Sequence, residues 1–454
     1  MSERRLLVKG GIVLTMDPVL GDVLGDVLIE DEHVTAVGSG LSAEGAEEID
    51  ARGMIVLPGL IDTHMHSWQT PLKGLYASGW TSEDYQDNVF SLRESFTPAD
   101  MYDATFAAGV EMIDGGVTGV LDFCHNIMSP EAADASLRAH RDNGQRALFG
   151  FGMLGSFDQL GVDHQWRLDK VRDLRGEVGT DPASLIRIGM AVSSMEYRSV
   201  EQVEAEVSMA RELGLPMTFH QNVGGQIREL HGLGLLGGDI LPAHANVAAD
   251  DELEMLADCG GGISFTPEGE FGGGRSMTVI GRALRAGVTP SLGVDTAARS
   301  NVDLFAQMRL TFALMRWIQA AEEREAGRPQ TRRPGVPLVD PRHMLEFATV
   351  NAARAIGLGD HLGRLAPGYL ADLIVVDPGP YGMGLGDPAD HVVLRTSPAD
   401  VDSVVIGGVV RKQGGKLTDL DAGDAGAAVQ RVRKRVLGES HRAMPPHLRK
   451  EPVA

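Results

Sequence analysis

Val56-Leu-Pro-Gly-Leu-Ile-Asp-Thr-His-Met-His66 is the stretch that decides the fold, because an apolar strand in it ends on two histidines. Side chains at positions i and i+2 of a strand lie on one face, so His64 and His66 can reach the same metal ion. This spacing alone is weak evidence for a metal site. It gains weight from other candidate ligands that end apolar runs elsewhere in the chain.

Three further apolar runs end on a residue type that binds metals: Leu215 to His220, Ile240 to His244, and Thr289 to Asp295. A single histidine is usually a satisfied core or surface residue. Four histidines and one aspartate, all at predicted strand ends, have a shared explanation in a metal site. We therefore expect these side chains to meet in space.

Eight apolar runs of strand length alternate with amphipathic segments of helical spacing, which predicts a (β/α)8 TIM-type barrel of the α/β class. The runs are residues 55–61, 117–123, 146–152, 186–192, 216–220, 239–243, 262–266 and 289–295. Every candidate ligand lies at the carboxyl end of its run. Active sites of such barrels are built at that end, so the fold and the metal site support each other.

Both ends of the chain read as short strands. Residues 6–14, 26–37 and 48–56 predict a small antiparallel sheet, and residues 363–377 and 402–411 return to strand character and complete it. We expect a small composite β-sandwich domain from residues 1–57 and 364–417, a barrel over residues 58–363, and a terminal helix and tail over residues 418–454.

Length and composition indicate an ordinary soluble enzyme. The 454 residues are 43% apolar, enough for a large core, and the net charge of −22 disfavours nucleic acid and anionic membranes as partners. The first residues lack the apolar segment of a signal peptide, and no apolar run could span a bilayer. Cys124 and Cys259 form no disulfide framework. We expect a cytoplasmic protein, for which a homodimer would be unsurprising.

The chain resembles the amidohydrolase superfamily, in particular its cytosine deaminase and triazine hydrolase branch. The resemblance rests on Pro58 to His66, on Asp295, on Asn351-Ala-Ala-Arg-Ala-Ile-Gly357 and on Gly363 to Asp372. It implies one divalent metal, with zinc as the default and Fe2+ as the alternative, and a catalytic His244 beside the bound water. The metal ligands that it implies are His64, His66, His220 and Asp295, of which Asp295 also accepts the proton of that water.

Two departures from the family pattern refine this expectation. Binuclear relatives bridge two metals through a lysine on the fourth strand, and the run from Leu185 to Ser193 contains none, so we predict one metal. Deaminases of this branch carry a glutamate three residues after the histidine of the fifth strand. Here that position is Val223, which cannot transfer a proton.

The candidate replacement acids are Glu268 and Glu270, which follow the seventh strand. Glu268 is favoured as the catalytic residue because it follows the strand directly. The alternative is that both are solvated loop carboxylates. The candidate substrate-binding residues are Trp68, Gln69, His125, Asn126 and Gln221, which together suit a planar, nitrogen-containing substrate. The segment from Gly74 to Glu94 is a candidate cover over the site.

These observations predict a mononuclear metal-dependent hydrolase that acts on a C–N bond of a small heteroaromatic or cyclic nitrogen compound. One alternative within enzymes is a ring-opening or cyclic amide hydrolase, which does not need the missing glutamate. Another is a hydrolase of C–Cl or C–S bonds. A different class of function also stays open. The chain could be a ligand-binding protein that kept the barrel and lost turnover.

Overall fold

Eight parallel strands form the central sheet, and their order in the sheet follows their order in the chain. The computed structural model describes residues 4–79, 81–153, 164–195, 198–272, 278–328 and 339–438. The strands are β6 (Leu60–Met65), β7 (Val117–Cys124), β8 (Arg146–Gly152), β9 (Ile186–Ala191), β10 (Met217–Gln221), β11 (Ile240–His244), β12 (Gly262–Phe265) and β13 (Thr289–Leu292). This arrangement confirms the predicted (β/α)8 barrel.

The last strand meets the first at the carboxyl end of the barrel. Met65 and Asp295 form a parallel bridge, in which the amide of His66 donates to the Asp295 carbonyl at 2.8 Å and the amide of Asp295 donates to the His64 carbonyl at 2.8 Å. Because these bonds join β6 to the segment after β13, they hold three of the candidate metal ligands in one backbone register.

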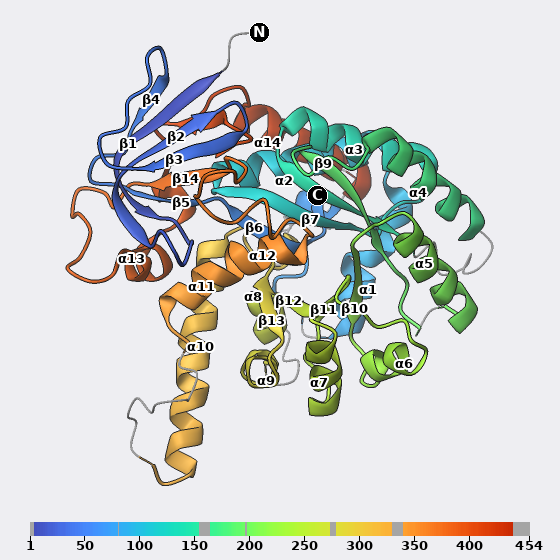
Figure 1. Cartoon of the computed structure of the whole chain (residues 1–454). Coiled ribbons are helices and arrows are strands. Elements are labelled where there is room, and N and C mark those ends of the chain that lie inside the picture. The colour runs from blue at the N-terminus through green and yellow to red at the C-terminus, as the bar shows by residue number, and fades with distance from the viewer. Residues whose placement is uncertain are drawn as a thin grey trace, which may run out of the picture.

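Helices between the strands cover the barrel (Figure 1). Their starts follow local rules, since Thr97, Ser129 and Asp340 each cap a helix whose first residue is proline. The helices are α1 (Ser82–Asn88), α2 (Pro98–Asp114), α3 (Pro130–Asn143), α4 (His164–Val178), α5 (Val200–Glu212), α6 (Gln226–Gly232), α7 (Asp250–Asp258), α8 (Pro267–Gly272), α9 (Ile280–Ala286), α10 (Leu304–Glu325), α11 (Pro341–Ala348) and α12 (Val350–Ala355).

A separate nine-stranded sheet joins the two ends of the chain. In Figure 1 its early strands lie beside β14, because β5 pairs with β1 on one side and with β14 on the other. Its strands are β1 (Arg5–Leu14), β2 (Asp22–Glu30), β3 (His33–Gly38), β4 (Glu47–Asp50), β5 (Ile55–Pro58), β14 (Leu373–Val376), β15 (Val401–Ile406), β16 (Val409–Gln413) and β17 (Lys416–Leu417).

Three details of the small sheet differ from expectation. The sheet is mixed, because β4 and β5 run parallel to β1. Residues 26–37 belong to a hairpin, whose two strands β2 and β3 turn back at Asp31, a residue in the left-handed region with φ 52°. The run 55–61 is two strands in two sheets, divided at Gly59, where a Cβ atom would lie 2.1 Å from the Thr118 hydroxyl.

The terminal helix expected within residues 418–454 is α14 (Ala422–Leu437). It packs on α2, where Arg431 pairs with Asp103 at 3.0 Å and the Arg435 guanidinium donates to Asp100 at 2.8 Å. The predicted tail beyond residue 438 lies outside the described residues, and the proposed domain boundaries stay a prediction. The helix α13 (Pro388–Arg395) lies between β14 and β15 in the sequence.

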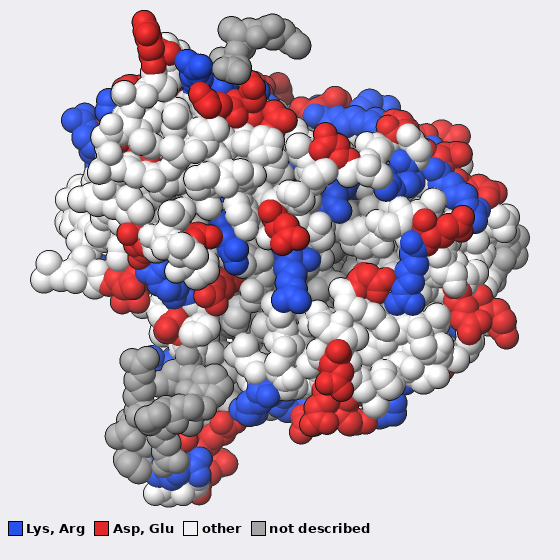
Figure 2. Space-filling view, in the orientation of Figure 1, with Lys and Arg blue, Asp and Glu red and all other residues white. Residues whose placement is uncertain are grey.

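Charged side chains on the face in Figure 2 occur in small groups of both signs, separated by uncharged surface. None of the described helices combines the length and the apolar character needed to cross a bilayer.

Candidate active site

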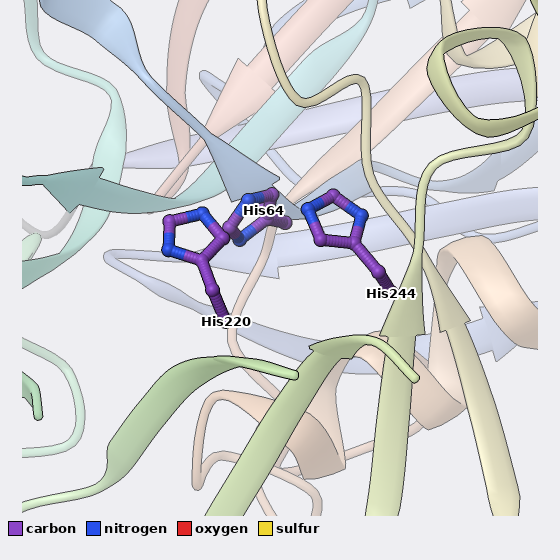
Figure 3. Close-up of side chains that lie close together, drawn as sticks. All are labelled: His64, His220 and His244. Atoms are coloured by element: carbon purple, nitrogen blue, oxygen red, sulfur yellow. The ribbon is translucent and has the colours of Figure 1, made fainter. Parts of the chain in front are cut away.

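Four imidazoles and one carboxylate meet at the carboxyl end of the barrel. They form two overlapping groups, His64 with His220 and His244, and His64 with His66 and Asp295, and within each group the ligand atoms lie within 4.8 Å of one another. Figure 3 shows the rings of the first group turned toward a common space from β6, β10 and β11. The structure thus brings together all four predicted metal ligands and the predicted catalytic His244.

Two of these residues have an uncommon backbone conformation. His244 has φ 70° and Asp295 has φ 73°, so both occupy the left-handed region that non-glycine residues rarely adopt. Each lies where the chain leaves its strand. Such strain persists only where the surrounding structure holds it, and it concentrates at functional sites.

The ring of His66 has a tautomer set by the backbone. Its Nδ1 donates to the Phe123 carbonyl at 2.8 Å, so Nε2 carries a lone pair. That Nε2 lies 3.3 Å from His220 Nε2 and 3.4 Å from the Asp295 carboxylate. Electron-rich atoms that converge in this way repel one another unless a cation or protons lie between them.

The electrostatics of the buried groups favour a cation over protons. Burial lowers the pKa of His64 to about 3, and it also holds the pKa of His220 well below its ordinary value. Burial acts to raise the pKa of Asp295, yet the close rings of His64 and His66 hold it well below the ordinary value. Neutral imidazoles and an ionised carboxylate are the states that bind divalent metals.

His64 gives a direct test of whether a metal fits. Its ring is fully buried, and neither of its nitrogens has a hydrogen-bond partner among the described residues. The Nε2 atom lies 3.5 Å from Asp295 Oδ1. A buried polar atom without a partner costs about 1–3 kcal/mol. A metal ion bound to His64 Nε2 would give this nitrogen a partner. The donor set of three histidines and an aspartate therefore fits a divalent ion.

His244 is held by Glu270. The Glu270 carboxylate, 2% exposed, accepts from His244 Nδ1 at 3.1 Å and from the amide of Thr266 at 2.9 Å. The sequence favours Glu268 instead. Glu268 points elsewhere, since its Oε2 accepts from Gln307 at 3.0 Å, and burial raises its pKa. The catalytic role of Glu268 stays a prediction, while Glu270 is the carboxylate that contacts a site histidine.

The predicted aromatic residues Trp68 and His125 are packed together behind the ligands. The Trp68 indole is fully buried and donates to His125 Nδ1 at 3.1 Å. The His125 ring lies 4.0 Å, centroid to centroid, from the ring of His66. This placement favours a supporting role for Trp68, because its face is covered by protein.

The predicted amides divide into two kinds. Gln69 is fully buried. Its side-chain nitrogen donates to the Tyr85 hydroxyl at 2.6 Å, and its side-chain oxygen accepts from the Thr296 hydroxyl. Asn126 and Gln221 are buried too, and the side-chain oxygen of each has no hydrogen-bond partner in the part of the chain that the structure describes. Within that part, both oxygens can accept a further hydrogen bond.

Sequence reasoning missed Asp62, which organises the backbone of the site. Its carboxylate accepts from the amides of His64 at 3.0 Å and Val294 at 3.3 Å, and so ties β6 to the segment that carries Asp295. Burial raises the pKa of Asp62 to about 8. The available signal was its spacing, two residues before His64 on the same strand face.

A barrel with imidazoles and a carboxylate converging at the strand ends defines a metal-dependent barrel enzyme. Residues 55–411 match the model of the Amidohydrolase family. The chain therefore belongs to the Amidohydrolase family, as the sequence resemblance predicted.

Two curated relatives are deaminases of nucleosides. The chain is 27% identical to a 5'-deoxyadenosine deaminase of Methanosarcina mazei, over 92% of this chain and 94% of the relative. It is 30% identical to a 5-methylthioadenosine/S-adenosylhomocysteine deaminase of Haloarcula marismortui, over 90% of this chain and 93% of the relative.

Solved structures share the fold at lower identity. An adenosine deaminase from Xanthomonas campestris with bound zinc superimposes with a TM-score of 0.82 at 22% identity, over 95% of this chain and 98% of the other. Atrazine chlorohydrolase from Arthrobacter aurescens complexed with zinc gives a TM-score of 0.81 at 22% identity, over 94% and 99%.

Proposed function

We propose that this chain is a metal-dependent hydrolase of C–N bonds in small heteroaromatic compounds, and that it holds one divalent ion, zinc by preference. The observation that carries the proposal is the convergence of His64, His66, His220, His244 and Asp295, whose ligand atoms lie within 4.8 Å in two overlapping groups. The strand β9 (Ile186–Ala191) offers no lysine for a second metal.

His64, His66, His220 and Asp295 would hold the ion. An ion held there supplies Lewis-acid activation of water. The Asp295 side chain keeps 19% of its surface exposed, and its pKa stays well below the ordinary value although burial acts to raise it, because the rings of His64 and His66 lie against it. It is therefore an ionised carboxylate at the open side of the site, suited to accept a proton from water and pass it to the leaving group.

His244 faces the same space from β11. Because Glu270 and Thr266 both contact its Nδ1 at 3.1 Å, the ring orientation is fixed and Nε2 is left for the site. With a hydrogen on both ring nitrogens, His244 would donate from Nε2 to the negative oxygen that develops when water adds to an electron-poor ring carbon.

Adenine nucleosides are the substrates to test first. The curated relatives are named for 5'-deoxyadenosine and for 5-methylthioadenosine and S-adenosylhomocysteine, whose adenine ring carries an exocyclic amine on an electron-poor carbon. The side-chain oxygens of Asn126 and Gln221 are acceptors suited to an amine or ring N–H.

Val223 marks the difference from a typical deaminase site. It occupies the position of the glutamate that the family resemblance calls for, and it is 42% exposed on the protein surface. A reaction that needs no acid at that position, such as ring opening of a cyclic amide, is the alternative that this residue favours.

The test is product analysis with purified, zinc-supplemented protein on 5'-deoxyadenosine, 5-methylthioadenosine and a panel of cyclic amides. Ammonia released with the ring intact is the expected result. A mass gain of one water would identify ring opening instead. A protein that binds metal and these compounds yet turns over none of them would be a ligand-binding member of the family.

A further inference from the structure

Two chains of hydrogen bonds meet at the Tyr85 hydroxyl. In each chain the first donor determines which atom donates and which accepts at every later step. The first chain begins at Trp68, whose indole N–H can only donate. It donates to His125 Nδ1 at 3.1 Å, so the hydrogen of the neutral His125 ring is on Nε2. That Nε2 lies 3.4 Å from the Tyr85 oxygen and therefore donates to it.

The second chain begins on the segment after β13. The amide of Ala298 donates to the Thr296 hydroxyl at 2.9 Å, and the hydroxyl in turn donates to the Gln69 side-chain oxygen. This bond orients the Gln69 amide, whose nitrogen donates to the Tyr85 oxygen at 2.6 Å. The Tyr85 oxygen therefore accepts from two sides.

Three members of this network, Gln69, Thr296 and His125, adjoin a metal-ligand candidate. Gln69 lies three residues after His66, and Thr296 directly follows Asp295. The His125 ring packs 4.0 Å from the His66 ring, centroid to centroid. The hydroxyl of Tyr85 is thus placed at the rim of the ligand cluster.

The segment that carries Tyr85 is fastened over the same end of the barrel. The amide of Tyr76 donates to the Ala298 carbonyl at 3.0 Å, and the Arg299 guanidinium donates to the Gly79 carbonyl at 2.6 Å. These contacts agree with the predicted cover over residues 74–94, of which Trp80 lies outside the described residues.

We propose that Tyr85 donates a hydrogen bond to an sp2 nitrogen or carbonyl oxygen of the substrate, next to the carbon that water attacks. The proposal rests on the proposed function and deepens it. A phenol oxygen that accepts two hydrogen bonds must direct its own hydrogen elsewhere, and that hydrogen would point into the site. Tyr85 would thereby polarise the ring, a task for which Val223 has no group.

The chemistry of the hydroxyl suits a donor that keeps its proton. Burial raises the pKa of Tyr85 well above its ordinary value, and the nearby Asp295 carboxylate acts in the same direction. The group therefore stays protonated through the neutral pH range. It stabilises negative charge on the substrate atom without passing its proton on.

The test compares Tyr85→Phe with Tyr76→Phe in zinc-loaded protein. Tyr76 is a matched control, since it lies in the same segment and its hydroxyl is satisfied by the Thr81 carbonyl at 2.9 Å. The probes are 5'-deoxyadenosine and its 1-deaza analogue, in which a C–H replaces the ring nitrogen next to the amino-bearing carbon. Binding is measured by calorimetry, and kcat and KM are measured for the parent compound.

We expect Tyr85→Phe to weaken binding of 5'-deoxyadenosine by roughly 2- to 13-fold, the range for one neutral hydrogen bond. We expect kcat to fall by roughly 10²- to 10³-fold, because charge builds on the acceptor in the transition state. The 1-deaza analogue should bind equally to wild type and variant. Equal losses for both probes, or a Tyr85→Phe variant that matches Tyr76→Phe, would overturn the proposal.

A second measurement separates this proposal from the proposed function. If wild-type protein binds neither nucleoside, the assignment of adenine nucleosides fails, and the network is then judged by nitrogen NMR of labelled His125. An unprotonated Nδ1, with an Nε2–H signal that shifts in Tyr85→Phe, supports a Tyr85 oxygen that accepts from His125 and directs its own hydrogen toward the site. A protonated Nδ1 in the wild type overturns it.

Discussion

Replacing Glu270 with Gln tests whether this buried carboxylate holds His244 for the site. Glu270 Oε1 accepts from His244 Nδ1 at 3.1 Å and from the Thr266 amide at 2.9 Å and hydroxyl at 3.3 Å. The substitution keeps the size of the side chain and removes its charge. Hydrogen bonds to charged groups contribute about 1.5–3 kcal/mol, which corresponds to roughly a 10- to 100-fold change in an equilibrium constant.

We therefore expect Glu270→Gln to lose roughly 10- to 100-fold in kcat/KM and to keep its zinc affinity, because His244 is not among the residues that would hold the ion. Zinc affinity is measured by competition with a chromophoric chelator, and folding is followed by circular dichroism and thermal unfolding.

Glu252→Gln is the matched control. Glu252 is 1% exposed and accepts from the amides of Ala249 at 3.0 Å and Arg228 at 3.2 Å. The control changes a buried carboxylate in the same way, and its hydrogen bonds are to backbone amides outside the ligand cluster. A folded Glu270→Gln protein with the activity of Glu252→Gln would refute the reasoning.

Three further outcomes are expected. Asp295→Ala removes a ligand and a proton acceptor, so elemental analysis and kinetics should show metal and activity falling together; full activity would exclude the assignment. Glu268→Gln should keep its metal and slow turnover by roughly 10²- to 10⁴-fold if Glu268 is a general acid or base. Because burial raises the pKa of Glu268, wild type should lose stability relative to this variant as pH rises above the ordinary glutamate value. Arg146→Met leaves the buried Asp372 carboxylate, 2.7 Å away, without its cation, and chemical denaturation should show a loss of about 3–5 kcal/mol.

Local sequence signals were sufficient for the barrel and for the ligand cluster. An apolar run that ends on a histidine is readable within a few residues, and parallel strands bring such ends together at one edge. That is why the amino-acid sequence alone places His220, on β10, and Asp295, after β13, near His64. The prediction of one strand over residues 55–61 was wrong. The run divides at Gly59, where Thr118 leaves no room for a Cβ atom, and this long-range contact cannot be read from neighbouring residues.

Side-chain direction after the strands could not be read from the chain. Glu268 and Glu270 both follow β12, and the sequence favoured the one nearer the strand. Both lie on α8 (Pro267–Gly272), where two residues turn the chain by about 200°. They therefore face opposite ways, Glu268 toward Gln307 and Glu270 toward His244.

Hydrogen-bond networks were equally hidden. The segment from Gly74 to Glu94 could be read as a cover, yet the role of Tyr85 depends on which nitrogen of His125 carries hydrogen. That in turn depends on Trp68, seventeen residues before Tyr85 in the chain. The direction of these hydrogen bonds is set only when the three segments that carry Trp68, His125 and Tyr85 pack together.

The central claim is that this cluster holds one divalent metal, and bound metal per chain tests it most directly. Elemental analysis of freshly purified protein, before any metal is added, is compared with the His66→Ala variant. We expect about one equivalent of zinc or iron in the wild type and its loss in a variant that remains folded. Wild-type protein without metal that also fails to take up added zinc, or a His66→Ala variant with the same content, would contradict the account.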